Sequence, residues 1–62
     1  MIDYIRTKQD GLIIYTSTCD RFIIRQTYHC NDREVIIDNH FKGLVSTVTA
    51  AKDFIADYNK FN

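Results

Sequence analysis

Proline is absent from this 62-residue chain, and glycine occurs only at Gly11 and Gly43. Such a composition contains no linker, no low-complexity tract and no array of long repeats. Two isolated glycines also exclude a glycine-rich phosphate-binding loop, which places several glycines in one turn. The length predicts a single small domain. Such a domain buries little apolar surface, so it commonly needs a partner to be stable.

Long apolar runs and net charge are missing as well. The longest apolar run, Leu12–Tyr15, is far shorter than the roughly 20 residues of a membrane helix, and no apolar segment follows Asp3 as in a signal peptide. We therefore expect a soluble, cytoplasmic protein without a membrane partner. Eight basic residues balance eight acidic ones. This balance argues against a polyanion-binding arm and against an acidic nucleic-acid mimic, but it leaves a local charged patch open.

Cysteine is scarce, with only Cys19 and Cys30. The two residues flank a predicted strand over 21–28, which would hold them roughly 30 Å apart at about 3.3 Å per residue. A disulfide requires two Cα atoms within about 7 Å. We expect two reduced thiols, in keeping with a cytoplasmic protein.

The first two thirds of the chain have the alternating and adjacent apolar residues typical of strands. The Asp10-Gly11 pair supplies the positive φ of a tight hairpin turn. Every connection is too short for a parallel crossover, so the sheet is predicted to be an antiparallel meander. The expected strands cover about residues 2–7, 12–18, 21–28 and 33–39.

After residues 40–43 the apolar spacing changes to three and four, which predicts an amphipathic helix over about 47–60. Ser46 or Thr47 is the expected N-cap, because its hydroxyl can accept a bond from a free amide of the first turn. The predicted fold is therefore α+β, a four-stranded meander with one C-terminal helix on one face (ββββα). The apolar positions that define the helical pattern are Leu44, Val48, Ala51, Phe54, Ile55, Tyr58 and Phe61.

The central strand, 21–28, is apolar on both faces in its middle, because adjacent strand residues point to opposite sides. We expect the helix to cover the face with Leu12, Ile14, Phe22, Ile24, Tyr28, Val35 and Ile37. One helix cannot also cover the other face, and an apolar patch rimmed by charge marks an interaction site. The predicted protein interface consists of Ile13, Tyr15, Arg21, Ile23, Arg25 and Ile36.

Residues 41–44 (Phe-Lys-Gly-Leu) and 47–57 (Thr-Val-Thr-Ala-Ala-Lys-Asp-Phe-Ile-Ala-Asp) resemble the C-terminal part of many small phage and prophage proteins. In those proteins a strand ends in an aromatic residue, and Ser or Thr caps a helix with an Ala-Lys-x-x-Ile-Asp core. Several anti-CRISPR proteins are similar in size and style. The resemblance implies a phage or mobile-element protein that inhibits or modulates a host protein, and it implies no catalytic residues.

Neither catalysis nor a cofactor is expected. No motif positions a cysteine beside a histidine as a nucleophilic dyad. Zinc ligands of the right type occur, but residues 29–32 and His40 would lie roughly 20 Å apart along the sheet. The candidate zinc ligands are His29, Cys30, Asp32, Asp38 and His40.

Two alternatives remain open for the partner. The chain could bind a second copy of itself instead of a host or phage protein. It could also bind nucleic acid, because basic residues interleaved with aromatic ones grip single strands. Glu34 and Asp38, expected near the same surface, weaken that alternative. The nucleic-acid surface would consist of Arg6, Tyr15, Arg21 and Arg25.

Overall fold

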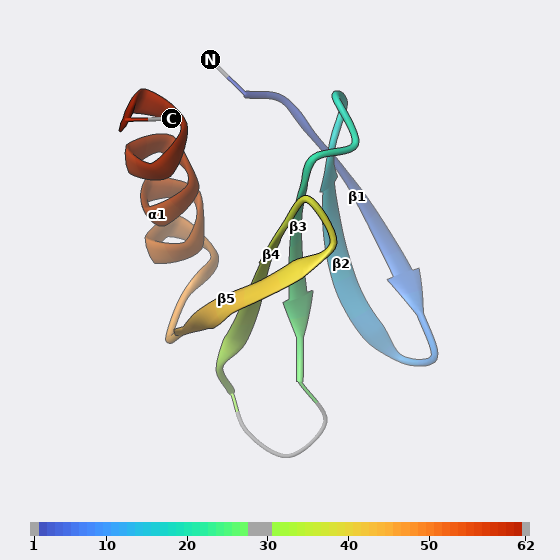
Figure 1. The fold of residues 1–62 in the computed structure, drawn as a ribbon. Helices are drawn as coiled ribbons and strands as arrows, with labels where there is room; N and C mark the ends of the chain where they lie inside the picture. The colour runs from blue at the N-terminus through green and yellow to red at the C-terminus, as the bar shows by residue number, and fades with distance from the viewer. Residues whose placement is uncertain (1, 28–30, 62) are drawn as a thin grey trace.

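A computed structural model describes residues 2–27 and 31–61 of the chain. Within these residues five antiparallel strands precede one helix, and each strand pairs with the next in chain order (Figure 1). The predicted α+β meander with a C-terminal helix is confirmed, whereas the predicted number of four strands is wrong. The elements are β1 (Tyr4–Gln9), β2 (Leu12–Ser17), β3 (Phe22–Gln26), β4 (Arg33–Ile37), β5 (His40–Val45) and α1 (Val48–Phe61).

The additional strand is β5, which lies where we expected only a connection to the helix. A two-residue turn separates it from β4: Ile37 pairs with His40, and both Asp38 and Asn39 have positive φ, 51° and 69°. Asp and Asn tolerate this left-handed conformation, which tight hairpin turns require at both central positions. The fourth strand therefore ends at Ile37 and does not continue to Asn39.

Strand β5 contains a β-bulge at Lys42. Ile36 pairs with Phe41 while Val35 pairs with Gly43, so Lys42 is an extra residue without a partner on β4. A bulge of this kind shifts the side-chain alternation by one position. Residues 41 and 44 therefore share one face of the sheet, although they are three positions apart.

Helix α1 packs on one face of the sheet, against β3, β4 and β5 (Figure 1). Apolar side chains make up the core cluster between them, and Ala51 and Ile55 of the predicted helical pattern belong to it. Thr47 caps the helix as expected, since its hydroxyl accepts a 3.0 Å hydrogen bond from the Ala50 amide. The buried core residues are Phe22, Ile24, Val35, Ile37, Ala51 and Ile55.

The side of strand β2 that faces α1 is not the side that we expected. Tyr15 pairs with the buried Ile24, so Tyr15 and Ile13 lie on the helix side of the sheet. Leu12 and Ile14 alternate with them and point away from α1. The prediction that Leu12 and Ile14 lie under the helix is therefore wrong.

The connection between β2 and β3 accounts for this register. The hydroxyl of the buried Ser17 accepts a 3.0 Å hydrogen bond from the Phe22 amide, and the Asp20 amide donates to the Ser17 carbonyl at 3.0 Å. Asp20 has a φ of 63°, which closes the turn in a left-handed conformation. Because Phe22 is a core residue, these bonds place Ser17, and with it every second residue of β2, on the helix side.

Cys19 in this connection is an exposed free thiol. Its sulfur lies 3.3 Å from the Ser17 hydroxyl, and this hydrogen bond is the main cause of a lowered pKa of the thiol. The predictions on Tyr28, His29 and Cys30 fall outside the described residues. In the described part of the chain, no helix has the length and apolar character needed to cross a membrane.

Candidate protein-binding face

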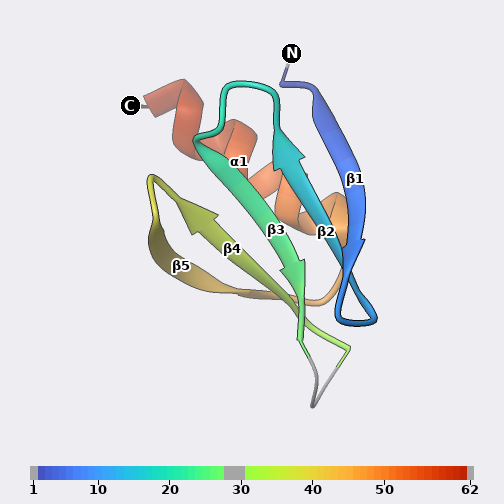
Figure 2. The same ribbon diagram turned by 90° about the vertical axis from the view of Figure 1, so that its right-hand side faces the viewer.

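The face of the sheet that points away from α1 is called the outer face here; Figure 2 shows the sheet in front of the helix, with this face toward the viewer. Antiparallel partners share a face, so the strand register identifies its residues. One row crosses all five strands near their middle. It consists of Ile5, Thr16, Ile23, Ile36 and Phe41.

This row is apolar at four of its five positions, and its ends are open to solvent. Ile5 is 57% exposed and Phe41 is 59% exposed, while Ile23 and Ile36 between them are half-buried. Leu44, also on the outer face because of the bulge, is 53% exposed. In the described part of the chain, only one other large apolar side chain is exposed, Phe54 on α1 at 38%. The exposed apolar surface is therefore concentrated on the outer face.

A second row on the outer face is mixed in character. At its centre Arg25 and Glu34 are cross-strand partners, and their side chains form an ion pair of 3.1 Å. Such an exposed pair contributes little to stability. It does neutralise both charges, so the centre of the outer face has no net charge. The row consists of Thr7, Ile14, Arg25, Glu34 and Leu44.

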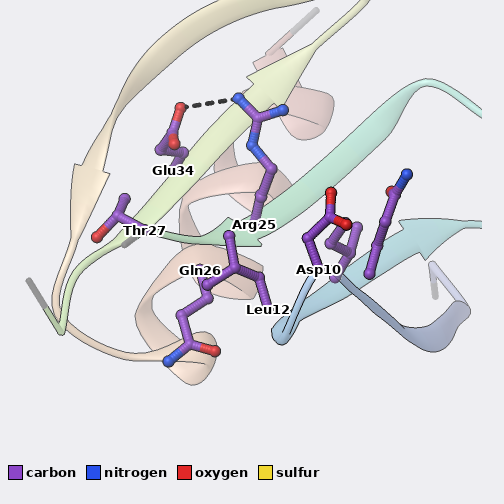
Figure 3. A pocket seen from close by; sticks show the side chains of 8 residues that line it. Asp10, Leu12, Arg25, Gln26, Thr27 and Glu34 are labelled. Carbon is purple, nitrogen blue, oxygen red and sulfur yellow. Dashed lines mark hydrogen bonds and ion pairs between the residues drawn. The ribbon is translucent and has the colours of Figure 1, made fainter. Parts of the chain in front are cut away.

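A hollow of about 360 Å³ opens beside this ion pair (Figure 3). Leu12 and Ile14 give it an apolar side, while Arg25 and Glu34 give it a charged side. The hollow has room for a side chain of moderate size, and it makes this part of the outer face concave. The lining residues are Gln9, Asp10, Leu12, Ile14, Arg25, Gln26, Thr27 and Glu34.

The structure separates the residues predicted to form the interface. Ile23, Arg25 and Ile36 do lie together on the outer face. Ile13 and Tyr15 do not, because β2 turns them to the helix side. Their predicted placement beside Ile23 is therefore wrong.

Arg21 lies in the connection before β3, at one end of the sheet. Its guanidinium donates two hydrogen bonds to Asp38 in the β4–β5 turn, at 3.0 and 3.2 Å. These bonds are the main reason that the pKa of Asp38 is lowered and the pKa of Arg21 is raised. Arg21 therefore links the β4–β5 turn to the connection before β3, and it does not lie at the centre of the outer face.

Sequence reasoning missed Ile5, Phe41 and Leu44 as members of the outer face. Ile5 had only a partial signal: the two-residue Asp10-Gly11 turn places Ile5 opposite Thr16, but the pairing of β2 with β3 decides which face these two residues share. Phe41 and Leu44 had none, because only pairing with β4 reveals the bulge.

The residues of the alternative nucleic-acid surface are also divided between two faces. Arg6 and Tyr15 are direct cross-strand partners on the helix side of the sheet. Arg25 is on the outer face and Arg21 at the sheet end, and each of these two is paired with a carboxylate. The single basic surface that we expected from these four residues does not form.

No family model matches this chain, and no curated protein or solved structure matches it with significance. Function therefore has to be inferred from the chain's own residues. The resemblance of residues 41–44 and 47–57 to small phage proteins stays a prediction.

Proposed function

We propose that this chain is a non-enzymatic protein-binding module that docks on another protein through the outer face. The apolar row from Ile5 to Phe41 is the observation that supports the proposal. Complete burial of an Ile or Phe side chain is worth about 1.5–3 kcal/mol, so burying the exposed part of Ile5 or of Phe41 stabilises a complex by roughly 1–2 kcal/mol each. The ion pair of Arg25 and Glu34 and the hollow beside it supply polar contacts for specificity.

The size of the outer face favours a larger partner over a second copy of the chain. Five strands about 4.8 Å apart and about five residues long make a face on the order of 400 Å² in projection. A standard interface buries about 800 Å² on each partner. A partner that also reaches around the edge strands β1 or β5 buries more surface than a second copy stacked on the outer face alone.

The chemistry of the outer face also favours a protein over a nucleic acid. Its apolar row has no phosphate-binding group, and its central cation, Arg25, is already neutralised by Glu34. A module of this kind acts by covering a surface of its partner. This mode of action fits the inhibitor or modulator of a host protein that the resemblance to phage proteins implies. The cytoplasmic location stays a prediction.

Phe41→Asp tests the proposal with little risk to the fold, because Phe41 is exposed on an edge strand. A charge in the core of an interface is desolvated without a partner, so we expect the variant to lose its binding protein. Thr49→Asp on the exposed side of α1 is the matched control, with the same change in charge. Affinity capture from a lysate of the encoding organism, quantified by mass spectrometry, compares the two variants with the parent.

The expected result is a protein captured by the parent and by Thr49→Asp and at least tenfold depleted with Phe41→Asp, which corresponds to about 1.4 kcal/mol. Calorimetry with that protein in purified form then measures the affinities directly. Equal capture by all three chains would show that the outer face is not the binding surface. Sedimentation velocity of the parent alone decides the homodimer alternative, since a dimer dispersed by Phe41→Asp identifies a second copy as the partner.

A further inference from the structure

The helix side of the sheet has an uncovered part. The backbone of α1 approaches β3, β4 and β5 but not β1 or β2. Beside the helix, Arg6 and Lys8 of β1 are exposed, whereas Tyr4 and Tyr15 are half-buried and pack against the edge of the core. Together with Arg33 of β4 and Lys52 of α1, these residues form a surface that we call the basic shelf. Its residues are Tyr4, Arg6, Lys8, Tyr15, Arg33 and Lys52.

The strand register and the helix bring these residues together. Arg6 lies opposite Tyr15 across the β1–β2 pair, and Lys8 is the next residue of β1 on the same side, about 7 Å further along. Arg33 and Tyr15 line one small hollow of about 90 Å³ at the foot of α1. Lys52 extends from α1, and its ammonium lies 5.2 Å from the Tyr4 ring centre and 5.3 Å from that of Tyr15.

The basic shelf contains four cations and no opposing carboxylate from the sheet. Glu34 is the single acidic residue in the five described strands, and it lies on the outer face. Within residues 2–27 and 31–61, Arg6, Lys8, Arg33 and Lys52 take part in no ion pair. On α1, Asp53 lines the adjoining groove together with Lys52 and Tyr4. The chain has no net charge, so this separation of charge is local.

We propose that the basic shelf binds single-stranded nucleic acid, with phosphates on Arg6, Lys8 and Arg33 and bases against the tyrosine rings. The cations favour a polyanion, and the half-buried rings of Tyr4 and Tyr15 favour nucleic acid over an acidic peptide, because bases stack on aromatic rings. Lys52 is exposed and moves from the rings to a phosphate when a base takes its place. The shelf and the outer face lie on opposite sides of the sheet, so a protein and a nucleic acid can be bound together.

A fluorescein-labelled twelve-nucleotide oligo-dT, followed by fluorescence anisotropy between 50 and 200 mM salt, is the probe. Three or four neutralised phosphates predict a slope of log affinity against log salt of about −2 to −3, since each contributes about −0.7 in single strands. Arg6→Glu with Lys8→Glu should weaken binding at least about tenfold through lost phosphate contacts. Lys42→Glu with Lys60→Glu changes the net charge equally outside the shelf, with Lys60 in the adjoining groove. This pair should weaken binding less than about threefold, because the two side chains make no phosphate contact in the proposal and act only through screened charge.

A second set of variants keeps the test decisive if the β1 variant fails to fold, as judged by its melting curve. Lys52→Glu on α1 should also weaken binding about tenfold, and Tyr15→Leu should do so through lost stacking, worth about 1–3 kcal/mol per base. Phe41→Asp should bind oligo-dT like the parent, which separates this proposal from the one on the outer face.

Several outcomes would overturn the proposal. Oligo-dT that does not bind at 50 mM salt, or that binds equally to the shelf variants and to the control pair, would show that the shelf is not a nucleic-acid site. Poly-glutamate bound as tightly as oligo-dT, or oligo-dT binding unchanged in Tyr15→Leu, would show that the shelf recognises negative charge alone, as an acidic protein segment would provide.

Discussion

Replacing Ile55 by alanine tests whether α1 holds the sheet in the way that the structure describes. Ile55 is fully buried, in a cluster with Phe22, Ile24, Val35 and Ile37. The substitution removes most of an aliphatic side chain from the only layer of contact between helix and sheet. The neighbouring strands are joined by hydrogen bonds and cannot collapse freely into the space, so a cavity remains.

The expected loss is large relative to the stability of the whole chain. Deleting a buried aliphatic side chain costs about 2–5 kcal/mol, part of it for the cavity. At about 0.05–0.15 kcal/mol per residue, a chain of this length has roughly 3–9 kcal/mol in total. Each kcal/mol lowers the melting temperature of so small a domain by about 4–8 °C. Ile55→Ala should therefore melt at least about 8 °C below the parent, or be unfolded at room temperature.

Thermal unfolding followed by circular dichroism measures the loss in melting temperature, and two further variants serve as comparisons. Ile55→Val removes one methylene and should cost only about 0.5–1.5 kcal/mol, so a melting curve is measurable even if the alanine variant is unfolded. Phe54→Ala changes the next residue, which is 38% exposed, and should cost clearly less than Ile55→Ala. If Phe54→Ala destabilises the chain as much as Ile55→Ala, or if Ile55→Ala melts within 2 °C of the parent, the helix does not face the sheet as described.

Two further predictions concern the connections at one end of the sheet. Ser17→Ala should cost about 1–3 kcal/mol in urea unfolding, because it leaves the buried Phe22 amide without its acceptor; a loss below 0.5 kcal/mol would contradict the register given for β2. Asp38→Asn keeps a residue suited to the positive φ of the turn but removes the carboxylate whose pKa Arg21 lowers, chiefly through their hydrogen bond. Because the folded pKa is the lower one, the carboxylate stabilises the fold above the unfolded value of about 3.9, and this contribution is lost as the pH falls through the folded value. The advantage of the parent over Asp38→Asn in the free energy of unfolding should therefore be larger at pH 7 than at pH 2, and a difference that is the same at both pH values would refute the role of the pair.

Local sequence patterns were sufficient to predict the first turn, the helix and the topology, because each had one strong signal. The Asp10-Gly11 pair forms a tight turn with positive φ at both residues, because few other residues adopt that conformation. The helix was predictable from its period and from the hydroxyl of Thr47. The antiparallel meander followed from short connections, which allow no other topology.

Strand β2 is an element whose orientation the local sequence pattern could not predict. Leu12 and Ile14 are as apolar as Ile13 and Tyr15, so a period of two fits either face equally well. The choice depends on pairing with β3, where Tyr15 meets Ile24 and the Phe22 amide bonds Ser17. A shift of one residue turns every side chain of a strand to the other face. For this reason the predicted interface contained two residues from the wrong side.

The sequence by itself therefore determined the class of fold, the helix and the central strand with two apolar faces. Only the tertiary structure decided the composition of the outer face. Phe41 and Leu44 are spaced like helix residues, and they share a face of the sheet because Lys42 bulges out against β4. Bulges and registers arise from hydrogen bonds between strands, which join residues that the sequence pattern of one strand cannot relate.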